Sequence, residues 1–516
     1  MAIKLVLLIV FFAVMLGIGI YSRQKAKSVN DYVLGGRTVG PWISAFAFGT
    51  SYFSSVVFIG YAGQFGWKFG LSSTWIGLGN AFIGSLLAWL ILGRRTRLMS
   101  QKLDAKTMPE YFGKRFDSKS LRIVGSIIAF IFLVPYTAGV YNGLSRLFGM
   151  AFDIDYRICV IVMALLTGAY VVIGGYMATA LNDFVQGIIM LIGICAVIIA
   201  VLNGQGGFLN AVKELSKVAT DPAVTTPAMS ESQGLFASFF GPDPLSLLGV
   251  IVLTSLGTWG LPQMVHKFYA IKDEKAVKTG TVVSTFFAII IAGGCYFLGG
   301  FGRLFGNYPG IQITNPDGTP GIAYDNIVPT MLSTLPDILI GIVVVLVFSA
   351  SMSTLSSLVL TSSSTLTLDL IKPVLMKNMK EKTQVRLMQV LVMVFIIISV
   401  VIAFNPPTFI AQLMGVSWGA LAGAFLAPFM FGLYSKKITK AGVWASYILG
   451  VGFTVVNMFC HIIESPINAG AATMVAGLIV VPIVSAITPK PDQEKVAEIF
   501  SCYEKRVSVP EKENLG

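Results

Sequence analysis

Long apolar runs recur along the whole chain and alternate with shorter polar segments. Thirteen of these runs approach the roughly 20 residues that an α-helix needs to cross the hydrocarbon core of a bilayer. They lie at 3–21, 41–63, 74–93, 122–147, 157–176, 182–202, 244–266, 279–301, 336–366, 387–404, 409–433, 441–461 and 469–488. The pattern predicts an all-α polytopic membrane protein with about thirteen transmembrane helices, in one domain over residues 1–488 followed by a tail at 489–516.

The composition agrees with a membrane protein. Of the 516 residues, 55% are hydrophobic and only 12% are charged, which is outside the range of soluble domains. The five cysteines have no spacing typical of a metal site or a disulfide framework, and both histidines lie near the ends of spans. No catalytic triad and no phosphate-binding loop is recognisable, so we expect a protein that is not an enzyme.

The basic residues orient the chain in the membrane. Of the 37 lysines and arginines, 30 lie in 22–40, 93–122, 263–278, 371–386, 435–440 and the segment from 489 onward. Because short cytoplasmic loops are enriched in these residues, we expect the N-terminus outside and the C-terminus in the cytoplasm. The net charge of +12 then reflects topology and not nucleic-acid binding. No N-x-S/T sequon occurs in the chain, which favours a bacterial inner membrane.

Two spans contain breaker residues near their middle. The second span reads PWISAFAFGTSYFSSVVFIGYAG, with Gly49, Thr50 and Ser51 at its centre, and the seventh carries small residues and a proline over 255–262. The two spans are five apart, so residues 41–202 and 244–433 have opposite orientations, as inverted repeats do. Interrupted helices at matching places in two repeats are typical of the binding sites of transporters, although the same residues also allow kinks and close packing.

The ninth span carries an unusual number of alcohols. Twelve of the nineteen residues from Ser349 to Thr367 are serine or threonine. On a helix, Ala350, Ser353, Thr354 and Ser357 share one face. Neutral oxygens suit sodium, because they replace its water without trapping it, and the unwound backbone around Thr50 and Phe53 would add carbonyl oxygens. The alternative is that these hydroxyls bond to carbonyls one turn earlier, above all in 361–367.

One carboxylate stands out among the spans. Asp183 lies near the start of the sixth span, within GGYMATALNDFVQGIIMLIG. A carboxylate in a membrane helix is costly and is usually functional or paired. Two interpretations remain open from the sequence, which are cation coordination and capping of the N-terminus of the helix.

Five segments carry a family resemblance. They are DYVLGGRTVG (31–40), the interrupted second span, GGYMATALNDFVQG (174–187), LPQMVHKFYAIKDEKAVKTG (261–280) and SASMSTLSS (349–357). In this order they resemble the sodium:solute symporter family over residues 1 to about 488. The resemblance implies a LeuT-type core of two inverted five-helix repeats, with one extra helix at 3–21 before it and two, at 441–488, after it.

The resemblance also implies ion and solute sites. One sodium site would use the backbone oxygens of Thr50, Phe53 and Ala350 and the hydroxyls of Ser353 and Thr354. A second sodium site, found in some members, would use Asp183, Ser353, Ser356 and Ser357. The solute would lie against residues of the second, fourth and seventh spans: Tyr52, Phe53, Tyr136, Thr254, Thr258 and Trp259.

The solute is the least determined feature. Proline permeases of the family carry an acid at the position of Tyr52 and aromatic residues at the positions of Thr254 and Thr258, so these departures count against proline. The segments LNDFVQGIIMLIG and GLPQMV are more similar to the pantothenate permease branch. We therefore expect sodium-coupled import of a small amino acid or carboxylate, such as pantothenate, by a protein whose partners are sodium, the solute and the bilayer. Proton coupling and a solute channel are the alternatives, and no obligate protein partner is evident.

Overall fold

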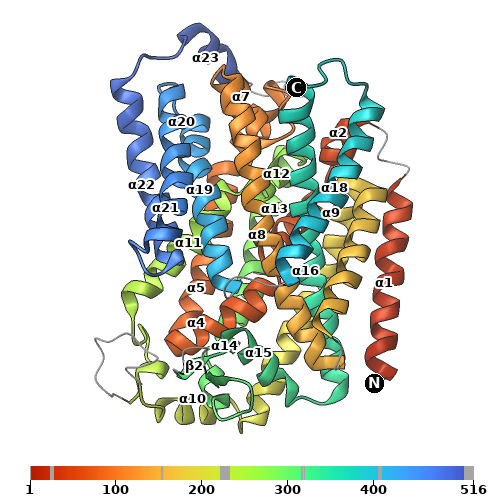
Figure 1. Cartoon of the computed structure of the whole chain (residues 1–516), viewed down its shortest axis with the longest axis vertical. Coiled ribbons are helices and arrows are strands. Elements are labelled where there is room, and N and C mark those ends of the chain that lie inside the picture. Colours follow the sequence, from red (N-terminus) through yellow and green to blue (C-terminus); the bar gives the residue numbers. More distant parts are fainter. Residues whose placement is uncertain are drawn as a thin grey trace, which may run out of the picture.

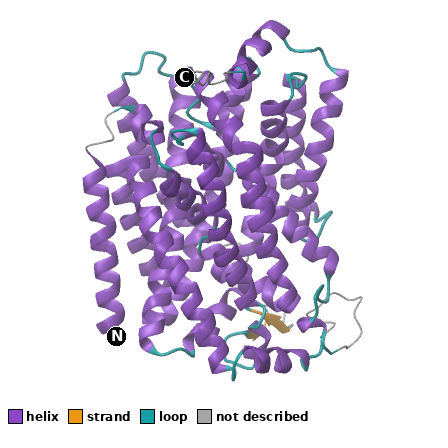
Figure 2. Ribbon diagram, turned by 180° about the vertical axis from the view of Figure 1, so that it is seen from behind, coloured by secondary structure: helices purple, strands orange, loops and turns teal. Residues whose placement is uncertain are grey.

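The computed structural model describes residues 2–23, 28–152, 155–220, 233–314, 318, 320–404 and 410–504. Long helices run side by side along the molecule (Figure 1). A two-stranded antiparallel sheet of β1 (Gln312–Thr314) and β2 (Pro320–Ile322) lies at one end, as the orange arrows of Figure 2 show. Residues 505–516 of the predicted tail lie outside the described residues.

The helices of the first half of the chain begin and end as follows: α1 (Ala2–Ser22), α2 (Val29–Leu34), α3 (Pro41–Tyr52), η3 (Val56–Tyr61), α4 (Ala62–Phe69), α5 (Thr74–Gly79), η5 (Asn80–Leu87), η6 (Trp89–Gly93), α6 (Arg94–Lys102), α7 (Met108–Arg115), α8 (Lys119–Phe152), α9 (Tyr156–Gly204) and α10 (Phe208–Ser216). Those of the second half are α11 (Pro244–Gly260), α12 (Pro262–Tyr269), α13 (Glu274–Ala288), η8 (Ile289–Gly293), α14 (Gly294–Gly299), α15 (Tyr324–Ser333), α16 (Asp337–Thr365), η10 (Leu366–Ile371), α17 (Lys372–Val374), α18 (Glu381–Phe404), α19 (Ile410–Tyr434), α20 (Lys440–Tyr447), η11 (Ile448–Gly452), α21 (Phe453–Cys460), α22 (Pro466–Ile487) and α23 (Gln493–Phe500).

The predicted helical, polytopic architecture is confirmed apart from the small sheet, but the number of thirteen spans is not. Within the described part of the chain, ten helices are long and apolar enough to cross a membrane, or eleven if the bent pair α11–α12 counts as one. Two of the ten, Val56–Lys102 and Arg157–Gly204, have 47 and 48 residues. Each is about twice as long as one crossing requires, and the sequence places parts of two spans in each.

Glycines bend the chain inside both long stretches. Gly70 has φ +63° and Gly175 has φ +56°, in the left-handed region that residues with a Cβ rarely adopt. A Cβ at Gly70 would also lie 2.2 Å from the carbonyl oxygen of Phe236, and one at Gly175 would lie 2.7 Å from that of Tyr32. Glycine therefore allows both the turn and the close approach of a second segment.

Both predicted interruptions are present, although the first lies later than expected. The sequence centres it on Gly49, Thr50 and Ser51, whereas α3 continues to Tyr52 and the backbone becomes extended at Phe53, with φ −105° and ψ 96°. The amide of Val56 donates to Ser54 Oγ at 3.1 Å, so this side chain helps the helix to restart. The second interruption falls at Leu261, before Pro262, where α11 and α12 meet at a bend of 46°.

The helices differ in how much of their surface is buried. In the most apolar part of the helical stretch that contains α16, 78% of the residues are buried, and in that of α19 the share is 83%. The corresponding shares are 28% for the N-terminal helix and 33% for α18. The alcohol-rich helix α16 therefore lies in the interior, whereas α18 and α1, which lies at the edge of the bundle in Figure 1, are more exposed. The start of α1 lies at the same end as α10, β2 and α15, while α7 and α23 lie at the opposite end. The assignment of these ends to the outside and the cytoplasm stays a prediction, as do the repeat boundaries.

Candidate sodium and solute site

The end of α3 meets the alcohol-rich face of α16 at the first interruption. The Ser353 hydroxyl donates to Thr50 Oγ1 at 2.8 Å, and the hydroxyls of Ser357 and Ser51 lie 2.8 Å apart. Thr50, Ser51 and Ser353 are each 0% exposed. The face of α16 that the helical spacing predicts is thus the one that contacts α3.

Thr354 concentrates oxygen atoms at this contact. Its Oγ1 lies 3.5 Å from Thr50 O, 3.3 Å from Ser51 O and 3.2 Å from Ala350 O. These distances exceed the 2.7–2.8 Å typical of hydroxyl hydrogen bonds, so the three carbonyls share one weakly held donor. Four of the five residues of the predicted first site therefore come together: Thr50, Ala350, Ser353 and Thr354. Their uncharged oxygens are ligands of the kind that sodium binds.

Phe53, the fifth residue of the predicted first site, lies at the break that follows α3. Its ring stacks on the ring of Tyr52, with centroids 4.2 Å apart, and lies 6.5 Å from that of Phe287. The carbonyl oxygen of Phe53 is not among the three that lie close to Thr354 Oγ1. Within the described residues, no group of three or more His, Cys, Asp or Glu side chains could hold a metal ion. The oxygen cluster at α3 and α16 is thus unlike a site for a transition metal.

The residues of the predicted second site are also neighbours. The Asp183 carboxylate lies beside the Ser353 hydroxyl. Ser356 donates to the carbonyl oxygen of Ser353 at 2.9 Å, and Ser357 pairs with Ser51. Asp183 lies well inside α9, beyond the bend at Gly175, so the interpretation that it caps a helix N-terminus is wrong.

Asp183 has a partner that the sequence reasoning missed. Lys267 Nζ, on α12, donates to Asp183 Oδ2 at 3.2 Å, and the two side chains are 2% and 0% exposed. Lys267 falls within 263–278, one of the basic segments expected to form a cytoplasmic loop. Its place five residues after Pro262, between the apolar residues of GLPQMVHKFYAI, was the available signal that it belongs to the interrupted helix.

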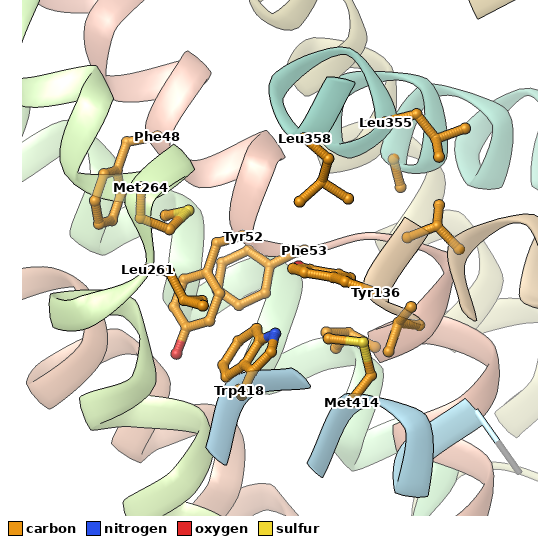
Figure 3. Packing of buried hydrophobic residues seen from close by; sticks show 14 of the residues in the cluster. Phe48, Tyr52, Phe53, Tyr136, Leu261, Met264, Leu355, Leu358, Met414 and Trp418 are labelled. Carbon is orange, nitrogen blue, oxygen red and sulfur yellow. The ribbon is translucent and has the colours of Figure 1, made fainter. Parts of the chain in front are cut away.

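Aromatic rings fill the space next to the break in α3. The hydroxyl of Tyr52 donates to Thr254 O across the gap to α11. Tyr136, on α8, packs edge-on against Trp418 with centroids 5.8 Å apart, and Tyr52 lies 6.3 Å from the same indole. Figure 3 shows Tyr52, Phe53 and Tyr136 gathered around Trp418, with Met414 beside it.

The remaining predicted solute residues face a different helix. Thr258 Oγ1 donates to Gly84 O at 3.0 Å and Trp259 Nε1 donates to Ile83 O at 3.0 Å, both in η5. The Thr254 hydroxyl donates within its own helix, to Val250 O at 2.8 Å. These polar groups already have protein partners. Of the six predicted residues, Tyr52, Phe53 and Tyr136 therefore form one aromatic group, Thr258 and Trp259 tie α11 to η5, and the Thr254 side chain bonds within α11.

Trp418 completes that aromatic group and was missed from the sequence. It is 2% exposed, and its Nε1 atom has no hydrogen-bond partner among the described residues. A Cβ on Gly257 would lie 2.5 Å from the indole, so the glycine makes room for it. The surrounding sequence, VSWGALAGAF, offers only a tryptophan among small residues, which is more often packing than a site.

Comparisons with known proteins agree with this architecture. The profile of the sodium:solute symporter family matches residues 32–450, most of the chain. The chain belongs to the sodium:solute symporter family. It is 30% identical over 505 residues to the osmoregulated proline transporter OpuE of Bacillus subtilis (strain 168), covering 96% of this chain and 97% of that protein. It is 29% identical over 527 residues to the sodium/proline symporter of Staphylococcus aureus (strain JH9), covering 96% of each.

Solved structures support the fold. A Na+-coupled sialic acid symporter in a substrate-bound outward-open state aligns with a TM-score of 0.73 at 17% identity, over 95% of this chain and 99% of that one. MhsT in complex with L-phenylalanine aligns with a TM-score of 0.53 at 14% identity, over 87% and 99%. The predictions of a LeuT-type fold and of a sodium-coupled symporter that is not an enzyme are thereby confirmed.

Proposed function

We propose that this symporter imports a small amino acid or carboxylate with sodium, and that sodium binds where the broken helix α3 meets α16. The contact of Thr354 Oγ1 with three backbone carbonyl oxygens carries the proposal. Bound sodium would replace weak hydrogen bonds by ion–oxygen contacts and hold α3 against α16. The inward sodium gradient, together with a membrane potential worth about 2.3 kcal/mol per charge per 100 mV, would drive the cycle.

The aromatic group around Trp418 is our candidate for the solute site. Tyr52, Phe53, Tyr136 and Trp418 are each at most 2% exposed, so the helices around them must separate before a solute can enter. Apolar rings beside the indole N–H of Trp418, which has no hydrogen-bond partner among the described residues, suit a solute with an apolar body and one polar end. Sodium would favour the outward-open state by ordering α3. Closure and rocking of the helices would then release the sodium ion and the solute to the cytoplasm.

Two solutes merit testing first. Proline is favoured by the two relatives named as proline transporters. Pantothenate is favoured by the local resemblance of residues 181–193 and 260–265 to pantothenate permeases. Tyr52 and Thr258 bond to backbone carbonyls of other helices, so the positions at which this chain departs from proline permeases have structural roles of their own.

Uptake into proteoliposomes tests the proposal. Purified protein is reconstituted, and entry of labelled proline and of labelled pantothenate is followed under an inward sodium gradient, an inward proton gradient, or neither. Accumulation above the external concentration only with the sodium gradient would support sodium symport. Accumulation that follows the proton gradient and ignores sodium would favour the proton-coupled alternative, and equilibration without accumulation would favour a channel.

A further inference from the structure

A buried lysine occupies the surroundings of the predicted second sodium site. Lys267 Nζ lies 3.2 Å from Asp183 Oδ2 and 5.4 Å from the centre of the Tyr176 ring. The lysine and the aspartate are 2% and 0% exposed. A negative carboxylate and the face of an aromatic ring are the two protein environments that stabilise a cation most directly.

The same carboxylate belongs to the second ion site that the family resemblance implies. Asp183 lies beside the Ser353 hydroxyl, and Ser353 is in turn hydrogen-bonded to Thr50 at the first candidate site. Asp183 is the one charged ligand of that second set, so it would supply most of the attraction for a second cation. Lys267 already delivers one positive charge to it.

A second sodium ion and the lysine compete for one negative charge. An ammonium and a sodium ion carry equal charge, and two unit charges about 4 Å apart in a poorly screened interior repel strongly enough to lower affinity by orders of magnitude. A sodium ion at Asp183 would also leave the buried ammonium of Lys267 without its counter-ion. The residues present therefore do not fit a second sodium ion as long as the ion pair is intact.

We propose that Lys267 is a tethered cation that takes the place of a second sodium ion at Asp183, so that the transporter couples each cycle to one sodium ion. This inference rests on the proposed function, sodium symport with the first ion at Thr354. The lysine belongs to α12 and the aspartate to α9, so the ion pair also joins the interrupted helix to its neighbour. Replacement of the ammonium by a neutral side chain of similar length should open the second site.

Sodium binding to purified protein tests this inference without knowledge of the solute. Equilibrium binding of radioactive sodium should give one ion per wild-type protein, two per Lys267→Met protein, and one per protein that carries both Lys267→Met and Asp183→Asn. Lys267→Arg, which keeps the charge, should bind one. Once a solute is known, the Hill coefficient for sodium should rise from 1 in the wild type toward 2 in Lys267→Met.

Each outcome has a distinct meaning. Two ions per wild-type protein would overturn the inference and leave sodium symport intact, as would a folded Lys267→Met variant that still binds one ion. No sodium binding to the wild type, with uptake that ignores sodium, would instead refute the proposed function itself. Thermal unfolding midpoints establish that each variant is folded, and if Lys267→Met does not fold, the wild-type count of one or two ions decides the matter.

Discussion

The Thr354→Val substitution tests the candidate sodium site most directly. Valine keeps the shape of threonine and replaces the hydroxyl by a methyl group. The hydroxyl that is lost lies 3.2 to 3.5 Å from the carbonyl oxygens of Thr50, Ser51 and Ala350. We expect the half-saturating sodium concentration to rise, because the ion loses one of its oxygen ligands. The fold should tolerate the change, since the lost hydrogen bonds are long and weak.

The magnitude follows from the kind of contact that is lost. A hydrogen bond to a charged group contributes about 1.5–3 kcal/mol, and we take the contact of one hydroxyl oxygen with sodium to contribute as much. Since every 1.4 kcal/mol is a factor of ten, the half-saturating sodium concentration should rise roughly ten- to a hundred-fold. The loss in unfolding free energy without sodium should stay below about 1.5 kcal/mol, the value of an ordinary hydrogen bond.

The assay compares two threonine variants in the same protein. The thermal unfolding midpoint is measured against sodium chloride, with choline chloride keeping the ionic strength constant, for the wild type, Thr354→Val and Thr454→Val. Thr454 is a matched control, because it is also buried but donates only to Gly450 O, one turn earlier on its own helix, at 2.7 Å. A sodium site at Thr354 is refuted if Thr354→Val keeps the sodium response of the wild type, or if Thr454→Val loses it to the same extent.

Three further predictions concern stability. Gly66→Ala should lower the unfolding free energy by at least about 2 kcal/mol, because the added Cβ would lie 2.0 Å from a backbone carbonyl oxygen at the end of α14. Gly452→Ala is the control: its added Cβ would lie in open space, so the melting midpoint should change little. Arg122→Met should lower the unfolding free energy by roughly 3–5 kcal/mol, because it leaves Asp369, which is 0% exposed and 2.8 Å from Arg122 Nε, without its cation. Asp369→Asn in the same protein should recover part of this loss, and a thermal unfolding midpoint that does not recover would contradict the role of the ion pair. Burial raises the pKa of Asp325 on α15 to about 6, above the roughly 3.9 of an unfolded chain, so its contribution to stability is present below pH ~4 and is lost as the pH rises through about 6. Asp325→Asn should therefore flatten the dependence of the melting midpoint on pH between about 4 and 7, and an unchanged slope would show that Asp325 does not titrate in this way.

The alcohol-rich helix illustrates how far local sequence can reach. Its helical periodicity selects the face with Ser353, Thr354 and Ser357, and these are the side chains that contact α3. The alternative for the distal run also holds in part, since Ser363 and Ser364 donate to carbonyls three or four residues earlier. Both results follow from the fixed 3.6-residue repeat, which any helix of this sequence would share.

The positions of the helix breaks show the limit of the same reasoning. Small residues permit an interruption but do not fix its place, and α3 passes through Gly49 before it opens at Phe53. Packing decides the place. A Cβ at Gly49 would lie 2.4 Å from the Phe287 ring, so this glycine provides space for α13 and does not break the helix.

The sequence by itself determined the class of the protein, the alcohol-rich face of α16 and the existence of two interrupted helices, because apolar runs, helical periodicity and breaker residues act over a few turns of chain. Only the tertiary structure decided which distant residues meet. Lys267 lies 84 positions from Asp183 along the chain, and Trp418 comes from a different helix than either tyrosine that it contacts. Such pairings depend on how helices pack across the whole bundle, and no local pattern of side chains specifies them.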